Sequence, residues 1–256
     1  MNLLSYNLEC PFFGIGRYEE RIDTFIETLV VQNFTILLLQ EIFTFSVIGL
    51  DIFSKSSYIE NKLQNIGYNH FLKSSPNWIF QNSGLFIASK IPIFQIDEIT
   101  YPHHEREEYF TRKGAIIFRK GDITFVNTHL HCMNQLPKFS LIRRQQLLQI
   151  KETLLKHNIT KNIVLAGDLN IDCRDKTELD DYNFLINLFP NGKDVLKPPF
   201  LVTSPPDGRL DYIIYYGKNY SFISSGILDA NGKIVVSDHL GIFGVLFPNN
   251  LNHTKS

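Results

Sequence analysis

Apolar runs of strand length recur from the first residues of the chain to its end, and they constrain the fold more than any other feature. Each run is rich in β-branched, leucine or aromatic side chains and is bounded by turn-forming residues. The runs are NLLSYNL (2–8), TILLLQEIF (35–43), SGLFIASK (83–90), GAIIFRKGDITFVNTHL (114–130), NIVLAGDLN (162–170), RLDYIIYYG (209–217), YSFISSGIL (220–228) and LGIFGVLF (240–247). The segment Lys120–Asp122 predicts a hairpin turn within the fourth run.

Helical patterns separate the earlier runs, over residues 17–34, 57–68 and 137–158. The first pattern predicts one buried face, made of Ile22, Phe25, Ile26, Leu29 and Val30. On the third, we expect Arg143 and Arg144 to lie on a solvated face. Since helices and strands alternate early and strands dominate late, the pattern predicts an α/β fold of sheets with helices packed outside.

The size and charge of the chain limit what it can be. The 256 residues, 44% of them hydrophobic, suffice for one large domain, expected at 1–247 with a polar tail at 248–256. The net charge of −1 provides no general attraction for a polyanion. Cys10, Cys132 and Cys173 are widely spaced, which favours free thiols. No apolar run would span a bilayer and the start resembles no signal peptide, so we expect a cytoplasmic monomer without an obligate protein partner.

Polar side chains stand at the ends of six of the apolar runs. They are Asn7, Glu41, His129, Asp168 with Asn170, Asp211, and Asp238 with His239. Taken singly, each has an ordinary explanation as a turn former, a cap or a structural histidine. Their recurrence favours a ligand site instead, because strand ends are where layered α/β proteins assemble such sites.

The chemistry of these groups is mutually compatible. Glu41, Asn7 and Asp238 offer hard oxygen ligands, which suit Mg²⁺ and also Mn²⁺ or Ca²⁺. Asp211 could accept a hydrogen bond from one nitrogen of His239, which would fix the tautomer of the imidazole. The remaining polar groups could handle a phosphate and a water molecule.

The motifs SYNLE, LLLQEIF, NTHLH, AGDLNID, RLDYII and SDHLGIF, in this order, resemble those of the endonuclease/exonuclease/phosphatase superfamily over nearly the whole chain. The resemblance implies a four-layer α/β sandwich: two mainly antiparallel sheets face to face, with helices outside. It also implies a metal site in which Glu41 is the principal ligand and Asn7 holds the metal or phosphate. Asp238 would support the metal or His239, and Glu9 could serve a second metal position.

The same resemblance assigns roles in catalysis. Asp168 would bind and orient the attacking water, while Asn170 and His129 would contact the phosphate. His239 would be a general base or a phosphate-binding imidazole, and Asp211 would orient it.

Two further stretches, NSGLFIASKIPI and EYFTRKGAIIF, resemble neutral sphingomyelinases and related phospholipase C-type enzymes, although NTHLH has His131 where Gln is common. This resemblance implies an Mg²⁺-dependent phosphodiesterase acting on sphingomyelin or a related phospholipid at a membrane surface, with Lys113 near the site. The alternative interpretation of Lys113 is an exposed lysine at the end of a strand. Trp78 and Phe80 could enter the membrane interface or pack into the core. The alternatives are an Mg²⁺-dependent endo- or exonuclease acting on DNA or RNA, and an inactive binding module.

Overall fold

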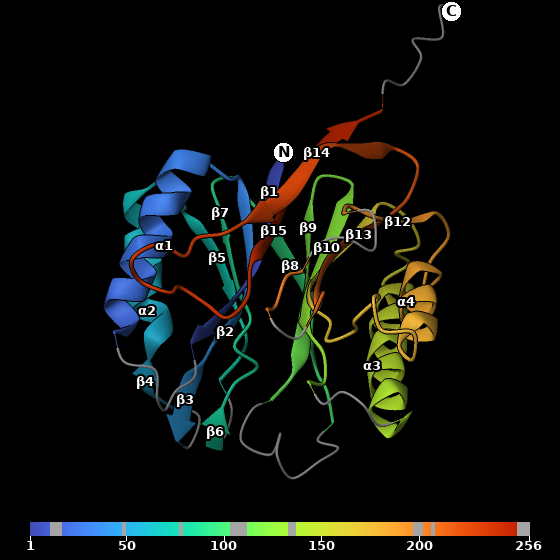
Figure 1. Cartoon of the computed structure of the whole chain (residues 1–256), viewed down its shortest axis with the longest axis horizontal. Coiled ribbons are helices and arrows are strands. Elements are labelled where there is room, and N and C mark those ends of the chain that lie inside the picture. Colours follow the sequence, from blue (N-terminus) through green and yellow to red (C-terminus); the bar gives the residue numbers. More distant parts are fainter. Residues whose placement is uncertain are drawn as a thin grey trace, which may run out of the picture.

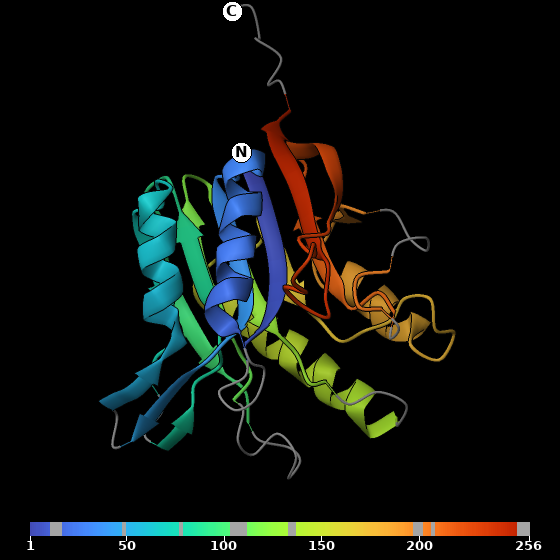
Figure 2. The ribbon, with the colours of Figure 1, turned by 60° about the vertical axis from the view of Figure 1, so that its left-hand side comes forward.

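Two six-stranded β-sheets lie face to face in the middle of the molecule, and helices cover their outer faces (Figure 1). The computed structural model describes residues 1–10, 17–47, 50–76, 79–102, 112–132, 137–196, 202–205 and 208–249. The helices are α1 (Tyr18–Gln32), α2 (Lys55–Asn65), α3 (Pro137–Lys156) and α4 (Leu179–Ile186). The first two cover one sheet and the last two cover the other, so the expected four-layer α/β sandwich is confirmed (Figure 2).

The first sheet, called sheet one below, contains both the first and the last strand of the chain. Its strands are, in spatial order, β14 (Tyr220–Leu228), β15 (Gly241–Pro248), β1 (Asn2–Cys10), β2 (Ile36–Ile42), β7 (Phe86–Ser89) and β5 (His70–Lys73). Only the β1–β2 pair is parallel. The pairing of β14 with β15 reaches Pro248, and the Asn249 N–H donates to Asn219 O. The strand β15 thus ends one residue past the domain end expected at 247.

The second sheet, sheet two, is built in the same way. Its strands are β12 (Gly192–Asp194), β13 (Asp211–Tyr216), β11 (Ile163–Asp168), β10 (Ile123–His129), β9 (Gly114–Lys120) and β8 (Phe94–Thr100). Here β10–β11 is the single parallel pair. Both sheets are therefore mainly antiparallel, as expected.

A small third sheet was not predicted. It consists of β4 (Leu50–Ser54), β3 (Thr44–Val47) and β6 (Ile79–Gln81), and it projects beyond the two main sheets (Figure 2). The sequence over 42–57 has no regular helical or strand period, so β3 and β4 could not be recognised from the pattern.

Strand alternation divides the apolar residues among three cores. On β1, Leu4, Tyr6 and Leu8 pack under α1 and α2, while Leu3 faces the other sheet. The two remaining cores lie between the sheets and under α3 and α4. By the same alternation, Ser5 and Asn7 face sheet two, so the space between the sheets becomes polar toward one end.

Two expectations about helix faces are wrong. Val30 is 59% exposed, because its side chain leaves the helix outside the buried face formed by Ile22, Phe25, Ile26 and Leu29. Arg143 is buried rather than solvated, because Glu178 and Asp181 near α4 lie against it. Among the described helices, none is long and apolar enough to cross a membrane.

Candidate active site

The polar residues of sheet two meet because their strands are neighbours in register. His129 at the end of β10 is the Cα partner of Asp168 at the end of β11. Asp168 is in turn the partner of Asp211 at the start of the antiparallel strand β13. Three residues far apart in the sequence therefore form one row at one edge of the sheet, and all three are buried.

Glu41 reaches this row from sheet one through an unusual backbone. Its φ of 62° lies in the left-handed region, as does the φ of 45° at Glu9 on the adjacent strand. Such conformations are costly for residues other than glycine and cluster at functional sites. The irregular pairing of β1 with β2 falls at the same place, between Asn7 and Cys10.

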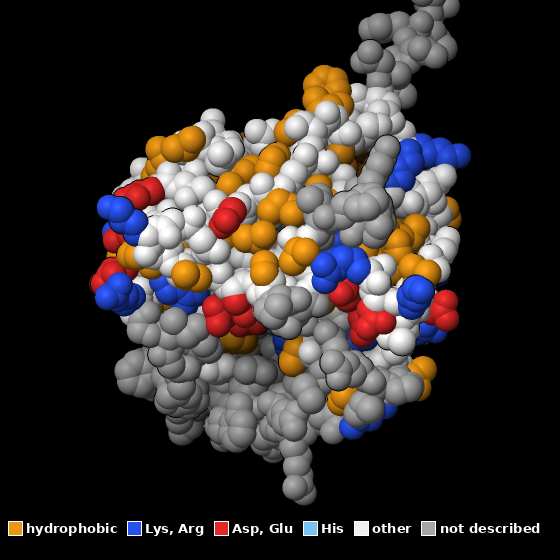
Figure 3. Space-filling view, in the orientation of Figure 1, with side chains coloured by type: hydrophobic (Ala, Val, Ile, Leu, Met, Phe, Trp, Pro, Cys, Tyr) orange, Lys and Arg blue, Asp and Glu red, His pale blue; other side chains and the backbone are white. Residues whose placement is uncertain are grey.

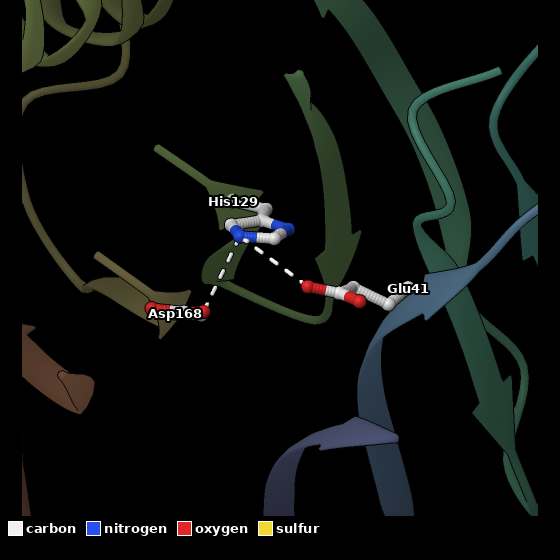
Figure 4. Close-up of side chains that lie close together, drawn as sticks. All are labelled: Glu41, His129 and Asp168. Carbon is white, nitrogen blue, oxygen red and sulfur yellow. Dashed lines mark ion pairs between the residues drawn. The ribbon is translucent and has the colours of Figure 1, made fainter. Parts of the chain in front are cut away.

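The side chains of Glu41, His129 and Asp168 point toward one another from the two sheets (Figure 4). His129 Nε2 lies 3.2 Å from Asp168 Oδ2 and 3.9 Å from Glu41 Oε1. The three ligand atoms lie within 4.8 Å of one another. Two carboxylate oxygens at this spacing fit a hard divalent cation, and a neutral imidazole nitrogen can complete the set.

Asn7 bridges the two carboxylates of this cluster. Its Nδ2 donates hydrogen bonds of 3.0 Å to Glu41 Oε1 and to Asp168 Oδ2. Its Oδ1 accepts from the Glu9 N–H at 3.0 Å. In this arrangement Asn7 spaces the carboxylates with its nitrogen, whereas the predicted role as a metal ligand would use its oxygen.

Lys113, directly before β9, lies at the site and is only 7% exposed. Its Nζ contacts His129 Nε2. It is therefore not the exposed strand-end lysine of the alternative interpretation, because its ammonium group is enclosed beside the imidazole.

His239 and Asp211 form a hydrogen-bonded pair beside this cluster. His239 Nδ1 lies 2.8 Å from Asp211 Oδ2, and its Nε2 faces Asp168 at 3.8 Å. Burial alone would lower the pKa of His239, but the charges of Asp211 and Asp168 raise it to about 10. Burial would likewise raise the pKa of Asp168, and it is held low instead by His129 and His239.

Asp238 stands at the rim of the site. Its side chain is 55% exposed, and its Oδ1 lies 3.9 Å from His239 Nε2. Burial of the carboxyl and the nearby Glu41 raise its pKa, while His239 opposes the shift. Among the described residues it is not part of the cluster of Glu41, His129 and Asp168, and its role as a metal ligand stays a prediction.

The other predicted residues have different surroundings. Asn170 has a left-handed φ of 51°, and its Nδ2 donates to Leu130 O at 3.1 Å. Phe80 belongs to β6, where it is the Cα partner of Ser46, and Trp78 lies outside the described residues.

Arg21 is a supporting residue that the sequence analysis missed. It lies in α1 next to the apolar stripe and is 4% exposed. Its guanidinium donates to the backbone oxygens of Leu8, Glu9 and Val236. It thus ties the end of β1 to the segment that leads to Asp238. The sequence offered one indication of this role: Arg21 stands directly beside the predicted apolar face of the first helix.

Comparisons with known proteins show which family and which folds the chain is similar to. The model of the Endonuclease/Exonuclease/phosphatase family, whose members depend on divalent metals, matches residues 4–239. No significantly similar sequence is found among curated proteins. Among solved structures, a beta toxin mutant from Staphylococcus aureus with bound magnesium ions is similar, with 17% identity and a TM-score of 0.68, over 95% of this chain and 98% of that one.

Two other similar structures differ in what they act on or bind. Sphingomyelinase C from Streptomyces griseocarneus has 16% identity and a TM-score of 0.65, over 97% of this chain and 99% of that one. D. rerio TDP2 complexed with a single-strand DNA product has 15% identity and a TM-score of 0.64, over 96% and 98%. At such identities the likeness concerns the fold. Because the family model matches residues 4–239, which is most of the chain, the chain belongs to the Endonuclease/Exonuclease/phosphatase family.

Proposed function

We propose that this protein is an Mg²⁺-dependent phosphodiesterase that hydrolyses sphingomyelin, or a related phospholipid, to a phosphorylated head group and a neutral lipid. The observation that carries the proposal is the convergence of Glu41, His129 and Asp168 from two sheets, beside the His239–Asp211 pair. A carboxylate cluster next to an imidazole with a strongly shifted pKa is typical of hydrolytic sites.

The residues divide the chemistry as follows. Glu41 and Asp168 would hold the divalent cation, which supplies charge neutralisation at a phosphoryl oxygen. Asp168 stays ionised because His129 and His239 lower its pKa, so it can accept a hydrogen bond from the attacking water.

In this scheme His239 donates a hydrogen bond to the phosphate of the substrate. With a pKa of about 10 it carries a proton at neutral pH, which favours the phosphate-binding imidazolium of the two predicted roles. Asp211 fixes its orientation through Nδ1, so Nε2, which faces Asp168, would be available to donate to a bound phosphate. In the hydrolysis, water would form the new phosphorus–oxygen bond and give up a proton toward Asp168, while the phosphorus–oxygen bond to the lipid breaks. The lipid oxygen would take up a proton from solvent and leave as an alcohol.

Several observations favour a lipid over a nucleic acid. The net charge is −1, and on the face shown in Figure 3 the coloured basic side chains are interspersed with acidic ones. Val235, in the segment that leads to Asp238, is 64% exposed, which provides an apolar contact near the site. The sphingomyelinase-like motifs around 82–93 and 108–118 support the same substrate class.

The experiment measures phosphocholine release from sphingomyelin vesicles, with Mg²⁺ and with excess chelator. His239→Ala should abolish release. His157→Ala should leave it intact, because His157 pairs with Asp97 away from the site. A parallel reaction on single-stranded DNA and RNA tests the alternative that the D. rerio TDP2 likeness keeps open. Chelator-sensitive cleavage of the oligonucleotides alone would replace the lipid substrate with a nucleic acid. Full activity of His239→Ala would refute the assigned site.

A further inference from the structure

A buried pair of amide side chains lies directly below the candidate metal cluster, between the two sheets. Gln40 on β2 and Asn127 on β10 are both 0% exposed. Leu38 and Phe125, two residues earlier on the same strands and on the same faces, belong to the apolar core between the sheets. The amide pair therefore separates this core from the site.

The two amides are hydrogen-bonded across the space between the sheets. Gln40 Nε2 donates to Asn127 Oδ1 at 2.7 Å and to Leu38 O at 3.0 Å. Asn127 Nδ2 donates to Leu39 O at 3.0 Å. Asn127 is thus fixed both to the side chain and to the main chain of a strand in the opposite sheet.

Each amide also stands next to one half of the cluster. Gln40 directly precedes Glu41, and Asn127 is two residues before His129, on the same face of β10. His129 is the Cα partner of Asp168. Any sliding of one sheet over the other would therefore change the distance between Glu41 and the two groups of sheet two.

Stability alone does not explain polar residues here. Apolar side chains could fill the same space without the cost of burying amides. Apolar packing is also non-directional, so it constrains the relative position of two sheets less sharply than a short hydrogen bond does. A site that binds a cation requires its ligands to be held within about half an ångström.

We propose that Gln40 and Asn127 are positioning residues that fix the two sheets relative to each other at the cluster and so determine its affinity for a divalent cation. The inference rests on the proposed function only in that the cluster of Glu41, His129 and Asp168 binds such a cation. It does not depend on which phosphodiester is the substrate.

The test removes the hydrogen bonds and fills the space with apolar side chains. Titration calorimetry with Mn²⁺ on chelator-treated protein would compare the wild type with the double variant Gln40→Leu/Asn127→Leu, and thermal unfolding would be followed without metal. We expect Tm to stay within a few degrees and the Kd for Mn²⁺ to rise at least tenfold. Thr124→Val, a buried change at the far end of β10, is the matched control and should leave the Kd unchanged.

A second variant shows whether the amides themselves matter. The exchange Gln40→Asn/Asn127→Gln keeps both amides and the total side-chain length across the gap, so it should return the Kd to within about threefold of the wild type. If the leucine pair does not fold, Gln40→Met takes its place, because it removes one donor at similar length and should also raise the Kd tenfold.

The outcomes separate the two proposals. Wild-type affinity in a folded leucine pair or in Gln40→Met overturns the positioning role, whatever the substrate. Weak binding with wild-type Tm, restored by the exchange variant, supports it even if neither lipid nor oligonucleotide is cleaved. A wild-type protein that binds no Mn²⁺ overturns this inference together with the metal-dependent function.

Discussion

Replacing Arg143 by methionine should destabilise the protein by about 3–5 kcal/mol at pH 7. The guanidinium Nη2 lies 2.8 Å from Glu178 Oε1 and 3.4 Å from Asp181 Oδ2, and all three side chains are at least nine-tenths buried. Methionine restores most of the volume but leaves two buried carboxylates without this cation. Breaking a buried ion pair by removing one partner costs an amount of this size.

The loss should depend on pH, and the direction follows from Glu178. Burial raises the pKa of this carboxyl, and Arg143 opposes the rise, so the variant should have a still higher pKa. A folded-state carboxyl pKa above the unfolded value destabilises the fold at high pH, and protonation relieves this as the pH falls. The deficit should therefore be largest near pH 8 and shrink toward pH 5.

Equilibrium unfolding in urea, with chelator present, measures this difference. Arg144→Met is the matched control on the same helix: Arg144 Nε also contacts Asp181, at 2.5 Å, but its side chain is 34% exposed. A partly exposed pair contributes about 1 kcal/mol or less. A loss in Arg143→Met no larger than that of Arg144→Met, or equal at pH 5 and pH 8, would refute the reasoning.

Three further predictions concern the site and its support. In Asp211→Asn the pKa of His239 should fall from about 10 toward 6.5. A raised histidine pKa stabilises the fold below pH 6.5, and this stabilisation is lost as the pH rises through 10, so the metal-free wild type should lose stability in urea between pH 8 and 10 and the variant should not. An NMR titration of His239 near 6.5 in the wild type would contradict this. Gly167→Ala should prevent folding or lower the free energy of unfolding by more than about 3 kcal/mol, because at φ 142° the added Cβ would lie 1.8 Å from Thr128 O. In the control Gly232→Ala the added Cβ meets no atom within 4 Å, so this variant should be tolerated. Equal thermal stability of the two variants would contradict the prediction. Asn170→Ala should be less stable than Asn170→Gly by about 1 kcal/mol, because only glycine accepts the left-handed backbone freely, and the reverse order in urea unfolding would argue against that strain.

The sequence predicts the layers of this fold well because most strands carry a local signal. The runs 114–130, 162–170 and 209–217 are largely apolar, and their polar ends predict where His129, Asp168 and Asp211 meet. The small third sheet gives no such signal, since its strands are short and irregular in pattern.

Side-chain environments set by distant elements could not be read from the chain. The burial of Arg143 depends on Glu178 and Asp181, more than thirty residues away. The interior position of Lys113 depends on His129 in the next strand. Local patterns contain neither partner, so the burial of Arg143 could not be predicted from them, and the position of Lys113 could not be decided between the site and the surface.

The pairing of β1 with β15 has a consequence for the order in which the protein can form during synthesis. Asn2 is the Cα partner of Val245, so β1 is synthesised long before β15, the strand that covers its outer edge. Until then, a nascent chain presents an open strand edge and lacks His239, although Glu41 and Asp168 already exist. Activity would therefore begin only after the segment with His239 has been synthesised, and a product that ends before it would carry an incomplete site on an unprotected sheet.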